Sequence, residues 1–104
     1  MRPLIYGYLR VASESQDEDL RRTELELRRF AEVEGFCLAT IFHEYTDGSH
    51  DAFNELTEQL KRADVHLVVV PTLAHLSSHP LLRASMLTLL DLRAHAHVLA
   101  VDEQ

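Results

Sequence analysis

Side chains that can bind a charged ligand occur in two short segments of this 104-residue chain, residues 10–16 and 72–79. The first segment begins with Arg10, whose planar guanidinium stays charged and can hold an anion such as phosphate through two parallel hydrogen bonds. The second contains His75 and His79, which with His50 would supply the three histidines of a catalytic zinc site. An anion or metal site at an Arg10/His75 crevice is therefore one possible function.

The histidine spacing does not match a metal-site motif, because His75 and His79 fall on either side of a loop. We therefore predict no metal site and no cofactor, and treat the anion or metal binder as an alternative. For such a site to exist, the fold must first bring the two segments together.

The spacing of apolar residues predicts the elements that would do so. We expect strands at residues 4–9, 38–43, 65–70 and 97–101, and helices at residues 17–34, 51–62 and 80–93. The valine-rich third strand is typical of a strand buried on both faces. Alternating strands and helices predict one α/β domain over residues 1–104: a mainly parallel four-stranded sheet in a three-layer α/β/α arrangement, with helices on both faces.

In such sheets, sites lie beyond the carboxyl ends of the strands, where the strand order reverses. If the first strand is central, residues 10–16 and 72–79 border this crevice. Local signals also set element ends: Gly35 is a plausible stop for the first helix, Asp51 can cap the second, and residues 47–49 read as a turn. In the third helix we expect four inward residues: Leu82, Met86, Leu89 and Leu90.

The composition argues against several classes of protein. Acidic residues number 17 against 10 basic ones, for a net charge of −7, whereas DNA-binding domains usually present a basic face. We therefore expect DNA binding by this chain alone to be weak or absent. The single cysteine, Cys37, excludes an internal disulfide. No signal peptide or membrane-spanning run is visible, so we predict a cytoplasmic protein without a membrane partner.

Both segments are similar to known motifs. Residues 8–16, Tyr-Leu-Arg-Val-Ala-Ser-Glu-Ser-Gln, resemble the opening of serine recombinases (resolvases and DNA invertases), which reads Tyr-x-Arg-Val-Ser-x-x-x-Gln. Residues 64–71 resemble the third strand of that family, and residues 73–78 align with its Leu-Asp-Arg-Leu-Ser-Arg. The resemblance runs from about Ile5 to Val101 with matching spacing, and it implies the resolvase-like catalytic-domain fold.

The resemblance also implies a chemistry. In this family a serine hydroxyl attacks a DNA phosphodiester and becomes joined to it, while arginines stabilise the developing charge. The corresponding positions in this chain are Arg10, Ala12 (nucleophile), Gln16, Ala74 (Asp), His75 (Arg) and Ser78 (Arg), with His50 at a further arginine position. Only Arg10 and Gln16 match, so we expect a vestigial site and no enzymatic activity.

The resemblance implies a helix-turn-helix DNA-binding module after the last strand, and we expect it to be lacking because the sequence ends at Gln104. Two other functions remain possible besides that of a catalytically inactive domain. Residual strand exchange or DNA cleavage could use Ser13, one residue beyond the nucleophile position. The other is the anion or metal binder at Arg10 and His75.

The third predicted helix is apolar on more than one side, which often indicates a second partner. We expect an interface with another copy or another protein, formed either by this helix through Leu81, Met86 and Leu87 or by the exposed edge of the last strand. The sequence thus predicts a catalytically inactive, recombinase-like interaction or regulatory module that forms a homodimer or binds another protein.

Overall fold

The computed structural model describes residues 2–12, 16–45 and 50–102. Its centre is a sheet of four parallel strands in the order β2-β1-β3-β4. The strands are β1 (Leu4–Arg10), β2 (Cys37–Glu44), β3 (Leu67–Val70) and β4 (His97–Ala100). The predicted α/β class, the parallel sheet and the central first strand are confirmed.

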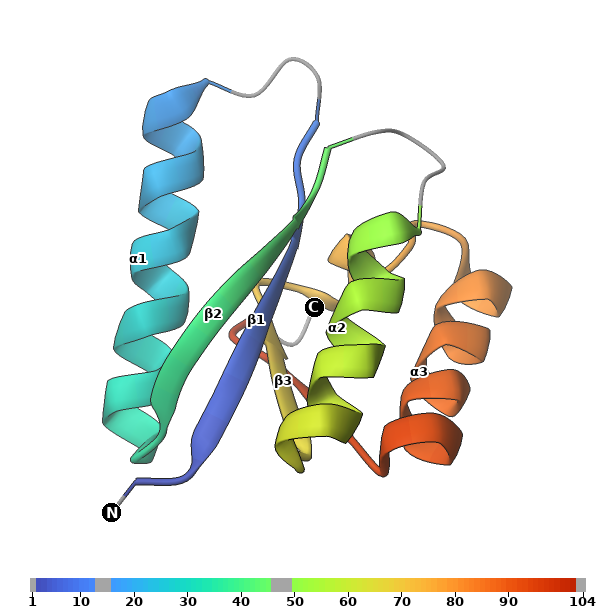
Figure 1. Ribbon diagram of the computed structural model, residues 1–104. Coiled ribbons are helices and arrows are strands. Elements are labelled where there is room, and N and C mark those ends of the chain that lie inside the picture. Colours follow the sequence, from blue (N-terminus) through green and yellow to red (C-terminus); the bar gives the residue numbers. More distant parts are fainter. Residues whose placement is uncertain (1, 13–15, 46–49, 103–104) are drawn as a thin grey trace.

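Three α-helices cover the two faces of this sheet. Helix α1 (Asp17–Glu34) lies on one face, and α2 (Asp51–Ala63) and α3 (Pro80–Ala94) lie side by side on the other (Figure 1). A short 3₁₀ turn, η1 (Leu73–His75), follows β3. The result is the three-layer arrangement expected from the alternation of strands and helices.

Each face of the sheet has its own core. One core lies between the sheet and the pair α2 and α3. It is formed by four strand residues, Tyr6, Tyr8, Val68 and Val70, which pack against apolar residues of both helices such as Leu56. The alternate residues Ile5, Leu9 and Val69 point the other way and pack against Leu27 and Ala31 of α1. This alternation is what a strand covered on both faces requires.

All three helices end at a residue whose backbone is in the left-handed helical conformation. Gly35, at φ 84°, ends α1 as predicted, and Asp64 and His95 occupy the same region after α2 and α3. The Val65 N–H closes the end of α2 by donating to the Leu60 carbonyl at 3.0 Å. Because Val65 belongs to this cap, β3 begins at Leu67, later than the predicted residue 65.

Helix α3 needs two corrections to its predicted faces. Leu82, expected to point inward, is 40% exposed, whereas Met86 and Leu90 are buried as predicted. Met86 is therefore part of the core of this domain and does not lie on the surface where an interface was expected. Leu87 is partly buried against the same cluster, and Leu81 is exposed. The predicted turn at residues 47–49 lies outside the described residues.

None of the helices in the described part of the chain is long and apolar enough to cross a membrane.

Candidate functional site

The two segments singled out in the sequence do meet. Strand β1 lies between β2 and β3, so the strand order reverses at β1 and its carboxyl end borders the loop after β3. Arg10, the last residue of β1, contacts His75 and Leu76 of the η1 segment. The predicted position of the crevice is therefore confirmed.

Arg10 is bound to the protein's own backbone. Its Nε donates to the His75 carbonyl at 3.4 Å, and its Nη2 donates to the Leu76 carbonyl at 3.1 Å and to the Tyr8 hydroxyl at 3.4 Å. At least three of the roughly five guanidinium N–H donors thus serve internal partners. This geometry fastens η1 to β1.

His75 accepts a hydrogen bond from the backbone N–H of Arg10 through Nδ1, at 3.2 Å. A ring nitrogen that accepts has no proton, so the contact favours the neutral imidazole with its proton on Nε2. Burial lowers the pKa of His75, and the nearby Arg10 charge lowers it further. The imidazole is therefore poorly suited to replace a permanently charged arginine.

A buried carboxylate, Glu44, anchors the other side of the site. It lies at the end of β2, 3% exposed, and its Oε1 accepts from the Tyr8 hydroxyl at 2.9 Å. The Ala52 N–H donates to Oε2 at 3.0 Å and the Phe53 N–H to Oε1 at 3.2 Å. Glu44 therefore caps α2 from the end of the preceding strand, and its negative charge is placed favourably at the positive end of the helix.

This cap replaces the predicted one. Asp51 is the first residue of α2, and His50 occupies the N-cap position without a side-chain cap hydrogen bond.

Burial, the hydrogen bond to Glu44 and the charge of Glu44 all raise the pKa of Tyr8, so its hydroxyl keeps the proton that it donates. Sequence reasoning missed both Tyr8 and Glu44, because their pairing depends on the register of β1 against β2.

The other predicted positions lie around this network. Ala12 is exposed just beyond β1, and Gln16 is exposed at the N-cap of α1 without a side-chain cap bond. Ala74 and Ser78 are also exposed, on η1 and after it. Ser13 lies outside the described residues. Of the predicted site residues, the structure thus brings Arg10 and His75 into direct contact.

The space beside Arg10 is small and mixed in charge. A hollow of about 70 Å³ is lined by Arg10, His75 and Asp19 together with Thr23 and three apolar residues. A carboxylate at its wall disfavours an anionic ligand. Within residues 2–12, 16–45 and 50–102, no group of three or more His, Cys, Asp or Glu side chains could hold a metal ion.

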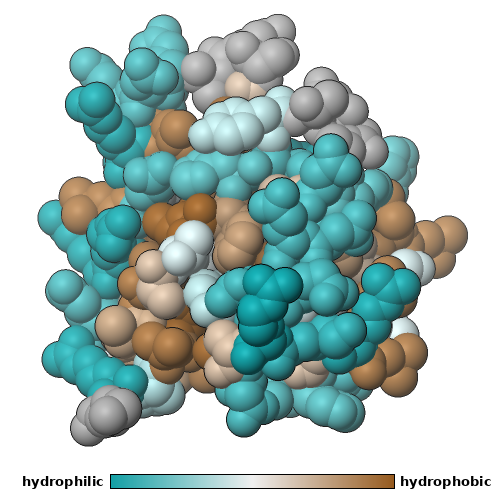
Figure 2. Space-filling model, viewed as in Figure 1, coloured by the Kyte–Doolittle hydropathy of each residue, from teal (hydrophilic) through white to brown (hydrophobic). Residues whose placement is uncertain are grey.

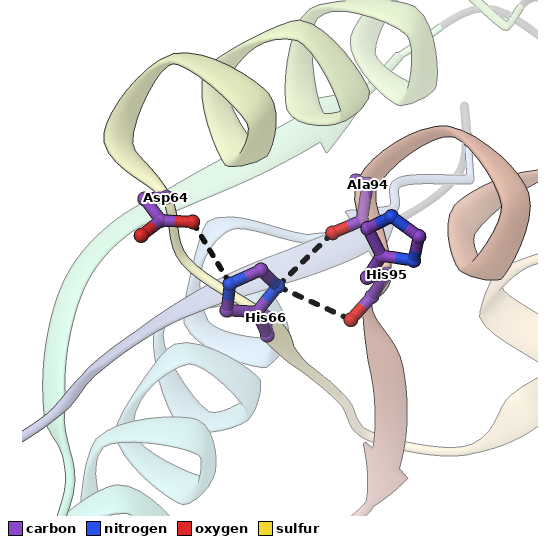
Figure 3. Close-up of polar contacts among 4 residues, drawn as sticks. All are labelled: Asp64, His66, Ala94 and His95. Atoms are coloured by element: carbon purple, nitrogen blue, oxygen red, sulfur yellow. Dashed lines mark hydrogen bonds and ion pairs between the residues drawn. The ribbon is translucent and has the colours of Figure 1, made fainter.

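A second histidine, His66, lies at the opposite end of β3, and Figure 3 shows its contacts with the end of α3. Its Nδ1 lies 3.1 Å from the Ala94 carbonyl and 3.2 Å from the His95 carbonyl, and its Nε2 lies 3.0 Å from Asp64 Oδ1. The hydrogen bond to Ala94 is the main cause that raises the pKa of His66, with Asp64 adding to it. A protonated ring can donate to both sides and compensate the negative end of α3.

Comparison with known proteins places this geometry in a family. Residues 5–104 match the family model for the resolvase N-terminal domain. No curated protein is similar enough in sequence to match.

Solved structures share the fold. The C-terminal catalytic domain of ISC1926 TnpA, an IS607-like serine recombinase, has a TM-score of 0.80 at 18% identity, over 97% of this chain and 72% of that one. A resolvase-family site-specific recombinase from Streptococcus pneumoniae has a TM-score of 0.79 at 18% identity, over 96% and 72%. The N-terminal catalytic domain of TP901-1 integrase has a TM-score of 0.75 at 14% identity, over 94% and 76%. Our chain therefore belongs to the resolvase family and has the fold of a serine recombinase catalytic domain.

Proposed function

We propose that this resolvase-family domain is catalytically silent and acts through protein contacts, as a homo-oligomeric interaction or regulatory module. The observation that carries the proposal is the state of Arg10. This retained arginine donates to the carbonyls of His75 and Leu76 and to Tyr8, so its role is to hold η1 against β1. An arginine held in this way is not preorganised for a DNA phosphate.

The surrounding residues support the same conclusion. Ala12, at the nucleophile position implied by the family resemblance, has no oxygen with which to attack phosphorus. His75 favours the neutral form, and Ala74 and Ser78 have no charge. Loss of a single preorganised donor typically costs on the order of 100-fold or more in rate, and several losses together abolish useful catalysis.

The charge of the chain supports a role in protein contacts. With a net charge of −7, the domain has no excess of basic residues to replace the counterions around DNA. We therefore propose that it binds DNA weakly or not at all by itself. The free, exposed Cys37 is compatible with the reducing cytoplasm that we propose as its location.

A search for covalent protein–DNA adducts tests the catalytic part of the proposal. The purified chain is incubated with supercoiled DNA from its host, denatured in detergent, and examined for protein that stays attached to DNA. An intact serine recombinase on its own substrate serves as the positive control. We expect no adduct and no relaxation or cleavage, and an adduct would refute catalytic silence.

A Ser13→Ala variant identifies the nucleophile if an adduct does form. Loss of the adduct in this variant would establish the alternative in which Ser13 replaces the missing serine. Gel-shift titration at low salt tests DNA binding separately, because charge-driven binding is strongest there. Binding by the isolated chain at submicromolar concentration would refute the weak-binding part of the proposal.

Affinity co-purification of the tagged chain from its host tests the interaction part. We expect the chain to recover either an untagged copy of itself or one stoichiometric protein. Recovery of neither would refute the interaction role.

A further inference from the structure

We propose that a second copy of this chain docks on the outer face of α3, with the two α3 helices antiparallel about a two-fold axis. The inference rests on the proposed function and gives its protein contact a surface and a geometry. The contact face, called here the α3 stripe, consists of Leu81, Ser85, Thr88 and Leu92.

The α3 stripe is the clearest concentration of exposed apolar side chains in the described residues. Leu81 is 86% exposed and Leu92 is 69% exposed, and Leu82 beside them is 40% exposed. These three are among the seven large hydrophobic residues that are exposed in the described part of the chain. Figure 2 shows hydrophobic residues along the right-hand edge, where α3 lies in Figure 1.

Helix geometry places the four residues of the stripe on one line. At about 100° per residue, positions 81, 85, 88 and 92 fall within roughly 60° of one another. They face away from Met86, Leu90 and Ala94, the residues with which α3 packs into the core. The helix therefore has two apolar sides, of which the fold of one domain uses only one.

The order of residues along the stripe suits a second copy of the same chain. Read in either direction it is leucine, small hydroxyl residue, small hydroxyl residue, leucine, with the same spacing. When two such helices run antiparallel, Leu81 of each copy faces Leu92 of the other, and Ser85 faces Thr88. A two-fold interface has this self-complementary form. The small residues near the axis let the two backbones approach closely, while the leucines close the two ends.

Charge also favours contact at α3. Helix α1 carries seven acidic and four basic side chains, and α2 carries three acidic and two basic. Helix α3 has Asp91 against Arg83 and Arg93, so it is the one helix of the three with a net positive charge. In a chain with a net charge of −7, contact at α3 brings fewer carboxylates face to face than contact at α1 or α2 would.

Antiparallel pairing further suits the ends of the helix. The first turn of α3 contains no acidic residue, whereas Asp91 lies in its last turn, the negative end of its own dipole. In the proposed dimer, Asp91 comes near the first turn of the other copy's α3, where a carboxylate is favourable. An interface made by one helix from each copy is small, so we expect a dissociation constant on the order of micromolar.

Sedimentation velocity from about 1 to 200 µM tests the interface. We expect a concentration-dependent monomer–dimer equilibrium, and we expect Leu81→Arg or Leu92→Glu each to weaken it by at least ~10-fold. Both leucines are exposed, so neither substitution removes a core contact; circular dichroism and thermal melts verify the fold. Val33→Arg is the matched control, because Val33 is 84% exposed on α1, and it should leave the equilibrium unchanged.

An equimolar mixture of the two α3 variants tests the antiparallel register. The mixture pairs Arg at position 81 of one copy with Glu at position 92 of the other and keeps Leu opposite Leu at the second contact. We expect a heterodimer that forms more tightly than either variant with itself and weakens as salt is raised.

Three results would overturn the inference: a wild-type chain that stays monomeric at 200 µM, a dimer unaffected by Leu81→Arg, or a mixture that fails to associate. None of them bears on catalytic silence, which the DNA-adduct assay decides. A monomer that recovers another protein from its host would refute homo-oligomerisation as well as this self-interface, and would leave only the contact with a different protein.

Discussion

Replacing Glu44 with alanine should remove a large share of the stability of this domain. The substitution removes a buried carboxylate that accepts hydrogen bonds from the Tyr8 hydroxyl and from the N–H groups of Ala52 and Phe53. Each buried donor left without a partner costs about 1–3 kcal/mol, and loss of a helix cap typically costs about 1 kcal/mol. Since part of these costs overlaps and water can reach some of the freed donors, we expect a loss of about 3–5 kcal/mol. Domains of this size are stable by only about 5–15 kcal/mol in total.

Urea unfolding followed by far-ultraviolet circular dichroism at constant pH measures this loss. With a slope of about 1–3 kcal/mol per M, Glu44→Ala should lower the midpoint by at least about 1 M. Glu55→Ala is the matched control, since Glu55 is an exposed carboxylate on α2 and its removal should change stability by less than about 0.5 kcal/mol. A loss of less than about 1 kcal/mol for Glu44→Ala would refute the view that this carboxylate holds β1 and α2 together.

Three further predictions follow from the site and the helix ends. In His75→Asn, an amide oxygen can accept the hydrogen bond from the Arg10 N–H in place of the imidazole. Because the pKa of His75 is lowered in the native state, wild-type stability falls as pH drops below the unfolded pKa of about 6.5. We therefore expect urea unfolding in acid to show a smaller loss of stability with falling pH for the variant than for the wild type. The pKa of His66 is raised, so stability depends on pH in the opposite direction: the contribution of His66 to stability is complete below about pH 6.5 and disappears as pH rises through the native pKa. His66→Ala should therefore lower the melting temperature more at pH 5.5 than at pH 8.5. An equal effect at both pH values would contradict a raised pKa for His66. Gly35→Ala should cost about 1 kcal/mol in urea unfolding, because no heavy atom lies within 4 Å of an added Cβ there and the cost comes from the φ of 84° alone; an unchanged midpoint would exclude backbone strain at this cap.

Elements with a strong periodic signal could be predicted from the sequence, and so could the position of the crevice. The helix that begins at Asp17 ends at Gly35 as predicted, because glycine adopts the left-handed region at little cost. The meeting of Arg10 with His75 followed from the strand order of a parallel sheet. In contrast, the start of β3 was wrong by two residues, since the end of α2 takes Val65 into its cap.

The content of the crevice could not be predicted in the same way. The sequence contains Tyr8, Glu44 and the start of α2, but it does not show that they meet. Which β2 residue lies beside Tyr8 depends on the register of β1 against β2, and that register shifts near Tyr6. Likewise, residue type alone suggests an anion-binding role for Arg10. Only the positions of the His75 and Leu76 carbonyls show that its donors serve the fold.

The central position of β1 has a consequence for how the chain is made. β1 leaves the ribosome before the other three strands of the sheet, and its neighbour β3 begins only at Leu67. At about 5–20 residues per second, the 56 residues between Arg10 and Leu67 take roughly 3–11 s to synthesise. Throughout that time, Ile5, Tyr8 and Leu9, which are almost fully buried in the finished domain, lack the core residues that β3 supplies. Completion of the sheet is therefore a late, long-range event, and until then β1 offers an open edge on which a chaperone or another nascent chain can pair.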